Sequence, residues 1–345
     1  MTGSQPGRAH IGSFTAAGGR GIATAALDPT DGALTLLGAT DELPDPSYLT
    51  VADGLLYAVS ETKGGAVAAF RTGTAPVTPA APPVPVDGDG PTHLSVWAGH
   101  LLTANYGSGS VTALPLRPDG TPDPAGRTVL QHTGSGPHPQ RQQAPHAHQV
   151  LADPSGTWAV SVDLGTDSIR VCALGDDGRP TLHHETALRP GSGPRHLVFH
   201  PSGSHAYVLN ELAPTLTVCH WDRTTGTLKP LTEHAVLPES PRGDAYPSEI
   251  VISPDGRFLW TATRGEDVIS LLTLDATGEH PTLRSTTPCG GHWPRDLALH
   301  PSGRFLYAAN ERSGDVTWFT VDQDTGEPVR GGMLRLPAAS CVVFS

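Results

Sequence analysis

Short apolar runs and turn signals alternate along this chain, and one stretch shows the pattern most clearly. Residues 194–211 read PRHLVFHPSGSHAYVLNE, in which an apolar run, an HPSG turn and a second β-rich run follow one another. Such runs on either side of a Pro-Ser-Gly turn predict an antiparallel hairpin. Because a hairpin brings its two open ends together, we expect Arg195 and His196 to lie beside Asn210 and Glu211.

The same hairpin pattern recurs from one end of the chain to the other. Its copies begin at positions 46, 91, 147, 194, 247, 294 and 337. This spacing is typical of propeller blades with four strands each. With 40 glycines and 34 prolines in 345 residues, long helices are disfavoured. The sequence therefore predicts an all-β fold, a seven-bladed β-propeller with four-stranded blades.

The two ends of the chain are expected to share one blade. Three β-rich runs between residues 11 and 40 lack an innermost partner, and the last copy, PAASCVVFS from Pro337, can supply it. Pairing of residues 338–344 beside residues 10–16 would close the ring and remove an exposed sheet edge. We expect one propeller domain over residues 1–345, in which residues 1–9 form a loose tail.

Composition narrows the classes of partner. There are 34 acidic and 22 basic residues, and the net charge of −12 disfavours nucleic acid and anionic membranes as partners. We find no apolar run long enough to span a bilayer and no apolar core of a signal peptide. The four cysteines are scattered, and three lie in strand-like runs, so we expect buried free thiols. We therefore expect a cytoplasmic monomer with a small-molecule substrate.

Two loops stand out from the repeats. The Pro-rich stretch at residues 75–90 is expected to be a stiff surface connection. The polar segment at residues 132–144, HTGSGPHPQRQQA, leads toward the channel side of the ring. The sequence leaves open whether this segment is a lid or an ordinary surface loop.

Aligning the repeats by their turns groups polar residues at one mouth of the central channel. Three positions of the repeat carry them: the second and third residues of the innermost strand and the end of the next strand. The charged and imidazole side chains expected at this mouth are Arg195, Arg264, Arg295, His148, His196, Glu211 and Glu311. The same positions in the second repeat hold His93 and Tyr106.

This group of side chains suits an anionic substrate. Guanidinium groups bind carboxylates and phosphates through two parallel hydrogen bonds, and a histidine or glutamate nearby can move a proton to or from water. The chain has no GxSxG elbow, CxxC pair, HExxH motif or P-loop. Two metal alternatives remain: zinc on the HxH pair His146 and His148, or calcium or magnesium on Asn105, Asn210, Glu211 and Asn310.

Several motifs together resemble a known family. They are PHAH, GPRH followed by LVFHPSG, YVLNE, YPSEIVISPDG with TRGED, and WPRDLALHPSGRFLYAANERSGDV. These are similar to the seven-bladed propeller lactonases, which include bacterial propeller-type 6-phosphogluconolactonases and the fungal carboxy-cis,cis-muconate cyclase. The resemblance covers residues 10–345 and is strongest over residues 145–325. It implies a catalytic set of His148, Arg195, Glu211 and Arg264, with no cofactor and no metal.

The leading hypothesis is a metal-independent lactonase that hydrolyses an acidic sugar lactone, with 6-phosphogluconolactone as the best single substrate. Arg195 and Arg264 would hold the anion or the developing oxyanion. Either Glu211 or His148 would activate water, and the sequence does not decide between them. We expect His93, Tyr106, His196, Arg295 and Glu311 to help bind the substrate. The alternatives are a cyclase that forms a lactone from a muconate-type dicarboxylate and a propeller that only binds a ligand or a protein.

Overall fold

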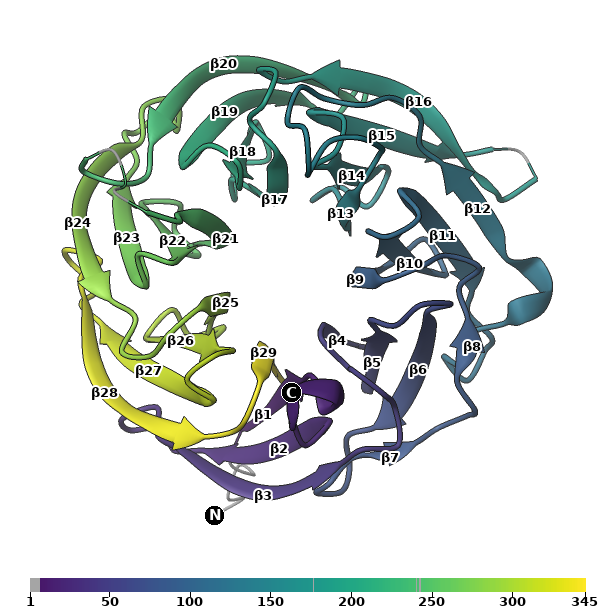
Figure 1. The fold of residues 1–345 in the computed structure, drawn as a ribbon, viewed down its shortest axis with the longest axis horizontal. Helices are drawn as coiled ribbons and strands as arrows, with labels where there is room; N and C mark the ends of the chain where they lie inside the picture. Colours follow the sequence, from purple (N-terminus) through teal and green to yellow (C-terminus); the bar gives the residue numbers. More distant parts are fainter. Residues whose placement is uncertain (1–6, 176, 240, 242) are drawn as a thin grey trace.

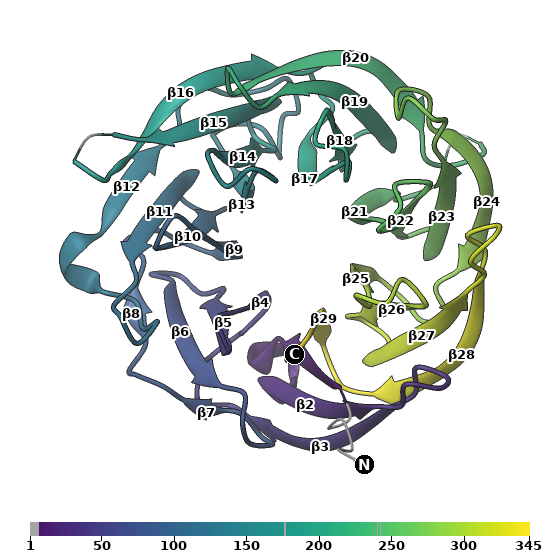
Figure 2. The ribbon, with the colours of Figure 1, turned by 180° about the vertical axis from the view of Figure 1, so that it is seen from behind.

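Seven β-sheets stand in a ring around a central axis (Figure 1), and Figure 2 shows the same ring from behind. The structure is a computed structural model that describes residues 7–175, 177–239, 241 and 243–345. Apart from two short 3₁₀ turns, η1 (Thr15–Ala17) and η2 (Pro124–Gly126), these residues form no helix. The predicted all-β, seven-bladed propeller is confirmed. No helix of the described residues has the length and apolar character needed to cross a membrane.

The blades follow one another along the chain, and in six of them the first strand in sequence is innermost. The blade in which the ends meet contains β29 (Ala339–Phe344), β1 (Arg8–Ser13), β2 (Ile22–Leu27) and β3 (Leu34–Thr40). The next two contain β4 (Leu49–Ala52), β5 (Leu55–Ser60), β6 (Ala66–Arg71), β7 (Thr78–Pro79) and β8 (Val84–Pro85), then β9 (Pro91–Trp97), β10 (His100–Asn105), β11 (Ser110–Pro115) and β12 (Thr128–Gln131). The fourth and fifth contain β13 (Ala147–Ala152), β14 (Ala159–Asp163), β15 (Ser168–Leu174) and β16 (Pro180–Ala187), then β17 (Pro194–Phe199), β18 (His205–Asn210), β19 (Thr215–Asp222) and β20 (Thr227–Ala235). The last two contain β21 (Tyr246–Ile252), β22 (Phe258–Arg264), β23 (Val268–Thr273) and β24 (Thr282–Pro288), then β25 (Pro294–Leu299), β26 (Phe305–Asn310), β27 (Asp315–Val321) and β28 (Pro328–Arg335).

The two ends of the chain pair as expected, with one correction. Strand β29 runs antiparallel to β1, with Phe344 opposite Ala9 and Ala339 opposite Ser13. Arg8 and Ala9 therefore belong to the sheet and not to a loose tail, and Ala9 is fully buried. Residues 1–6 of the expected tail lie outside the described residues.

The Pro-rich stretch is also more regular than expected. Its residues form two 2-residue strands, β7 and β8, which both pair with β6 at the outer edge of the blade. Proline is tolerated there because an edge strand leaves one side of its backbone without a ladder partner. The stretch therefore completes its blade instead of only bridging two blades.

Neighbouring blades are joined by apolar packing and by a repeated hydrogen bond. Between the β13–β16 and β17–β20 blades, for example, Val162, Ile169, Leu197 and Val208 belong to one buried cluster. Three tyrosines on second strands donate to a glycine carbonyl in an outer turn of the next blade: Tyr57 to Gly120 (2.8 Å), Tyr207 to Gly278 (2.7 Å) and Tyr307 to Gly32 (2.8 Å). These glycines have φ values of 76° to 80°, a region that suits glycine. All four cysteines are buried free thiols, as predicted.

A β-bulge recurs near the start of the innermost strands and positions the polar side chains. The pairing register shifts between Ala147 and Gln149, between Pro194 and His196, and between Pro294 and Asp296. The extra residues are His148, Arg195 and Arg295. A bulge bends the strand and redirects a side chain. It therefore lets two consecutive residues of one innermost strand face the axis region, which a regular strand with its period of two does not allow.

Candidate active site

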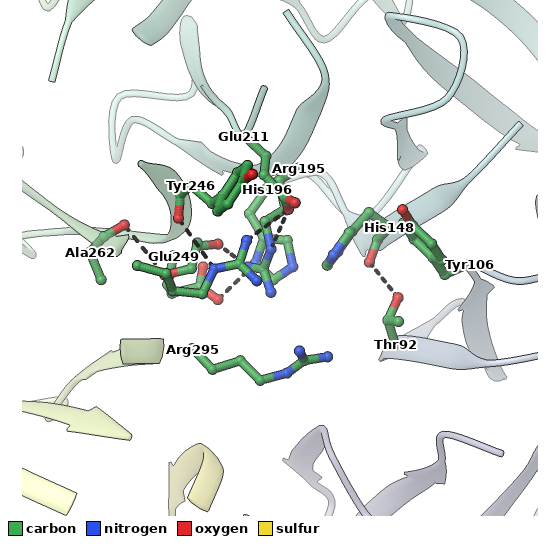
Figure 3. A network of polar contacts seen from close by, with 12 residues as sticks. Thr92, Tyr106, His148, Arg195, His196, Glu211, Tyr246, Glu249, Ala262 and Arg295 are labelled. Atoms are coloured by element: carbon green, nitrogen blue, oxygen red, sulfur yellow. Dashed lines mark hydrogen bonds and ion pairs between the residues drawn. The ribbon is translucent and has the colours of Figure 1, made fainter. Parts of the chain in front are cut away.

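Glu211 is the centre of a buried charge cluster. It directly follows β18, at the end of the hairpin whose other end carries Arg195. Its Oε2 lies 2.9 Å from Arg264 Nη2 and 3.3 Å from Arg195 Nε, and its Oε1 lies 2.7 Å from Arg141 Nη2. Figure 3 shows Arg195 and Glu211 turned toward each other, with His148 pointing toward them from the neighbouring blade. We call this end of the channel, where the innermost strands begin, the site mouth.

The charges of the cluster do not cancel. Burial by itself raises the pKa of Glu211, but Arg264, Arg141 and Arg195 together lower it to about 2. Burial and the neighbouring Arg264 lower the pKa of Arg195 to about 10. Three guanidinium groups thus share one carboxylate, which leaves a formal charge of +2 in a buried place. Such an imbalance favours binding of an anion.

Backbone carbonyls of β21 hold the two inner arginines in place, across the blade boundary for Arg195 and within the same blade for Arg264. Arg195 Nη1 donates to the carbonyl oxygen of Ser248, and Arg264 Nε donates to that of Tyr246 at 3.2 Å. Arg195 Nε and Arg264 Nη2 remain buried without a well-aligned hydrogen-bond acceptor, although both contact Glu211. Both nitrogens face Glu211 Oε2, so the two arginines concentrate positive charge around this carboxylate.

The 132–144 segment contributes a residue that the sequence analysis did not single out. Arg141 Nη2 bonds to Glu211 and to the hydroxyl of Tyr106 at 3.1 Å. The adjacent Gln142 is fully buried, where its Nε2 donates to the carbonyl of Leu164 and its Oε1 accepts from the amide of His138. The segment is therefore anchored beside the site. Arg141 falls outside the repeats, so alignment of the blades could not find it; an arginine four residues before the PHAH motif was the one available signal.

His148 occupies the bulge of β13, in the blade next to the one that carries Glu211 (Figure 3). Its backbone carbonyl accepts a hydrogen bond from Thr92 Oγ1 at 3.1 Å, and its Nδ1 is buried without a partner. Burial, and then Arg195 and other nearby cations, keep the pKa of His148 well below its usual value. The imidazole is therefore neutral at physiological pH and able to accept a proton. The ring of Tyr106 packs edge-on against it, with centroids 5.5 Å apart.

Arg295 and Glu311 form a second, separate ion-pair group near the axis. Arg295 Nη2 lies 3.1 Å from Glu61 Oε2, and its Nη1 lies 3.6 Å from Glu311 Oε2. The guanidinium also lies over the ring of Phe14 at 4.8 Å. Two carboxylates already balance the positive charge of Arg295. This group therefore attracts an anion less strongly than the cluster around Glu211 does.

His93 and His196 do not lie where we expected them. The ring of His196 is 1% exposed and packs against the rings of His148 and His93, at centroid distances of 5.1 and 5.4 Å. Its Nδ1 lies 2.7 Å from Glu249 Oε2, away from the arginine cluster. The bulge explains the difference, because the third residue of each innermost strand faces deeper into the channel than the second.

A cavity of about 440 Å³ reaches this deeper layer from the other end of the channel. It is lined at its inner end by third-position residues, Tyr48, His93, Gln149, Glu249 and Asp296, and by none of the second-position residues. Its outer lining includes Val51, Leu151, Val251 and Leu299, which lie toward the carboxyl ends of the innermost strands. We call this end the far mouth. The layer of Tyr48, His93 and His196 lies between the two compartments.

Some side-chain atoms of the two metal alternatives have other partners in the structure, whereas His148 Nδ1 and the amide oxygens of Asn210 and Asn310 are buried without one. His146 Nδ1 bonds to the carbonyl of Tyr106 at 2.8 Å. The amide nitrogens of Asn105, Asn210 and Asn310 donate to Ser, Thr or Asp side chains of their own blades. Within the part of the chain that the structure describes, no group of three or more His, Cys, Asp or Glu side chains is arranged to hold a metal ion.

Comparison with known proteins agrees with this architecture. The family model "Lactonase, 7-bladed beta-propeller" matches residues 8–344. The 6-phosphogluconolactonase of Bacillus subtilis is 33% identical over 270 residues, 76% of each chain. The crystal structure of the periplasmic gluconolactonase of Pseudomonas aeruginosa has a TM-score of 0.91 at 28% identity and covers 98% of both chains. A Lactobacillus plantarum protein gives the same TM-score at 28% identity, with 99% of both chains covered.

The fold places a cluster of three arginines and one glutamate at the axis of a seven-bladed propeller. The chain belongs to the seven-bladed β-propeller lactonase family, and it is a lactonase-type hydrolase.

Proposed function

We propose that this lactonase hydrolyses an acidic sugar lactone without a metal ion, and that 6-phosphogluconolactone is its best substrate. The observation that carries the proposal is the uncompensated charge at Glu211, where two buried arginines and the partly exposed Arg141 share one carboxylate. A neutral ligand would leave that charge unbalanced, whereas a phosphate or carboxylate balances it. The Bacillus subtilis relative carries the name of this activity.

In this proposal His148 is the general base. It is neutral at physiological pH and has an unpaired ring nitrogen, whereas Glu211, with a pKa of about 2, is too weak a base and is committed to three arginines. His148 takes a proton from the attacking water, a new carbon–oxygen bond forms at the lactone carbonyl, and Arg195 and Arg264 stabilise the oxyanion. The ring C–O bond then breaks, and the histidine returns the proton to the leaving alkoxide. Glu211 positions the arginines.

Tyr106 and Arg141 line the approach to this site in the proposal. The side chain of Arg141 is 34% exposed, so an anion that enters through the site mouth meets it before the buried arginines. The ring of His196 packs against His148, and that of His93 packs against His196. In the proposal neither ring touches the substrate. We also propose a cytoplasmic location for this protein. The Pseudomonas aeruginosa neighbour is named as a periplasmic enzyme.

A substrate panel tests the proposal. With 6-phosphogluconolactone, neutral gluconolactone, an aliphatic lactone and a carboxymuconate, each corrected for spontaneous hydrolysis, we expect kcat/KM for the phosphorylated lactone to exceed the others by at least about tenfold. His148→Asn should lower kcat by roughly 10²-fold or more. Equal turnover of the neutral lactones would contradict the charge argument, and turnover of the muconate alone would favour the cyclase.

The panel is repeated after exhaustive treatment with EDTA. We expect no loss of activity, because the proposed chemistry uses arginines and an imidazole only. Loss that added Ca²⁺ or Mg²⁺ restores would contradict the metal-independent mechanism and would point back to the asparagine residues near the site.

A further inference from the structure

A pair of buried carboxyl groups lies on the axis and has no part in the mechanism above. Glu249 on β21 and Asp296 on β25 line the same cavity from neighbouring innermost strands, and the charge of Glu249 raises the pKa of Asp296. Each is also held by a backbone amide: Ile250 N donates to Glu249 Oε1 at 3.0 Å, and Val342 N donates to Asp296 Oδ2 at 2.8 Å. In the part of the chain that the structure describes, neither carboxyl forms an ion pair with a lysine or arginine. The pair is therefore able to gain or lose a proton without breaking a salt bridge.

The pair lies between His148 and the far mouth. On one side, His196 contacts Glu249 through Nδ1 and packs against the ring of His148. On the other side, both carboxyl groups line the cavity that opens at the far mouth. The 2.7 Å contact of His196 with Glu249 is short but poorly aligned, and His196 Nε2 is buried without a partner. A small rotation of this ring changes which neighbour it bonds.

Lactone hydrolysis needs a way out for a proton. Water and the lactone give a carboxylic acid and an alcohol, and the acid ionises, so each turnover releases one proton. That proton is formed among guanidinium groups, which disfavour any further positive charge. The site mouth is covered by the product at that moment. Glu211 is a poor acceptor because its three arginines hold its pKa at about 2.

We propose that the Glu249–Asp296 pair accepts the proton released by hydrolysis, through His148 and His196, and passes it to water in the cavity at the far mouth. The proposal rests on the hydrolytic function argued above. In each cycle the product carboxyl loses a proton to neutral His148, His196 relays it, and the carboxyl pair gains it and then gives it to the cavity. No bond other than O–H and N–H changes in these steps, and no electrons are transferred.

The charged and titratable groups around the pair fit this role. They come from all the innermost strands that pack against it: Tyr48, His93, Arg195, His196, Arg295 and Cys341. Burial raises the pKa of both carboxyl groups, and Glu249 raises that of Asp296 further. Burial also lowers the pKa of His93 and His196 well below the usual value. A proton is thus held briefly on the imidazoles and more stably on the carboxyl pair.

The double variant Glu249→Gln/Asp296→Asn tests the proposal, because it keeps the size and hydrogen bonding of the pair and removes its acid–base chemistry. We expect kcat in dilute buffer to fall about tenfold while KM stays unchanged. Adding 50–100 mM of a small buffer such as imidazole, at constant pH and ionic strength, should restore kcat. A kcat equal to that of the wild type in dilute buffer, or a loss that no buffer restores, would overturn the proposal.

A second position tests the route without touching the pair, should the double variant fail to fold. Thr50 lines the same cavity and is partly exposed. Thr50→Lys places a cation in the proton path and should reduce kcat several-fold in dilute buffer, whereas the matched control Thr50→Val should not. Equal rates for the two variants would overturn the route through the far mouth.

The two proposals fail in different ways. An inactive wild type removes the proposed function, and the relay falls with it. An active wild type whose rate does not respond to the carboxyl pair or to Thr50→Lys removes the relay alone and leaves the function intact.

Discussion

Two glutamates at the axis of this propeller show how differently one residue type behaves in two compartments of one channel. Glu211 and Glu249 are both buried, at 2% and 6% exposure. Glu211 faces three arginines, which lower its pKa to about 2, whereas Glu249 faces another carboxyl group, and burial raises its pKa. In our proposals, the site mouth therefore binds the anionic substrate, and the deeper layer holds a proton. Burial raises the pKa of both groups; three arginines outweigh burial at Glu211, whereas burial prevails at Glu249.

The largest effect should come from removing the charge of Glu211. Glu211→Gln leaves two buried arginines and the partly exposed Arg141 without a counter-charge, so we expect the free energy of unfolding to fall by about 3–5 kcal/mol at pH 7. The folded pKa of Glu211 lies below its unfolded value. Its contribution is therefore full above pH 4.5 and is lost as the pH falls toward 2. Urea unfolding at several pH values measures this.

The control for this variant is Glu233→Gln. Glu233 pairs with the exposed Arg189 at 2.7 Å, so we expect a loss below about 1 kcal/mol. If the two variants lose the same free energy of unfolding, the cluster at the site mouth is not a buried arrangement that depends on the charge of Glu211.

Arg195 should have the next largest effect, and it should appear in catalysis. Arg195→Ala removes a buried donor near the reacting carbonyl and should cost about 2–4 kcal/mol of transition-state stabilisation in kcat/KM. Arg195→Lys should recover only part of this, because an ammonium group cannot reproduce the planar fork. Steady-state kinetics at an unchanged melting temperature measures both. Wild-type turnover in Arg195→Ala would place the active site elsewhere on the propeller.

Glu249 should show the opposite pH dependence to Glu211. Its folded pKa is raised, to about 7 from 4.5, so the wild type loses stability as the pH rises through this range. Glu249→Gln should remove that loss. We expect it to be more stable than the wild type at pH 8, by no more than roughly 3 kcal/mol, and no more stable at pH 4. A variant that is destabilised equally at both pH values would show that the carboxyl pair does not hold a proton.

Arg141 should give the smallest effect and should change mainly KM. It is partly exposed, so its attraction for an anion is screened by solvent and salt. Arg141→Gln should raise KM for a phosphorylated lactone about 3–10-fold and leave kcat within about twofold. The increase should shrink at 0.5 M salt. A large fall in kcat would instead make Arg141 part of the chemical step.

The sequence by itself determined the ring and the principal site residues. Repeated hairpins predicted seven blades, and the orphan runs near residue 11 predicted closure by the C-terminal strand, because each blade needs its own innermost strand. The open ends of the 194–211 hairpin placed Arg195 beside Glu211, and the same alignment added His148 and Arg264. These predictions succeed because strand pairing within a blade is local in the sequence.

The tertiary structure decided how the polar residues divide between two compartments. Alignment of the repeats by their turns assigned Arg195 and His196 to the same mouth of the channel. A β-bulge that no residue pattern predicted places them in different layers. The contact of Arg141 with Glu211 depends on how a non-repeating loop folds back over the ring. The contact of Glu249 with Asp296 joins strands about 47 residues apart whose side chains meet only when neighbouring blades pack together. Contacts of this kind depend on the distance between elements in space, which local sequence patterns do not encode.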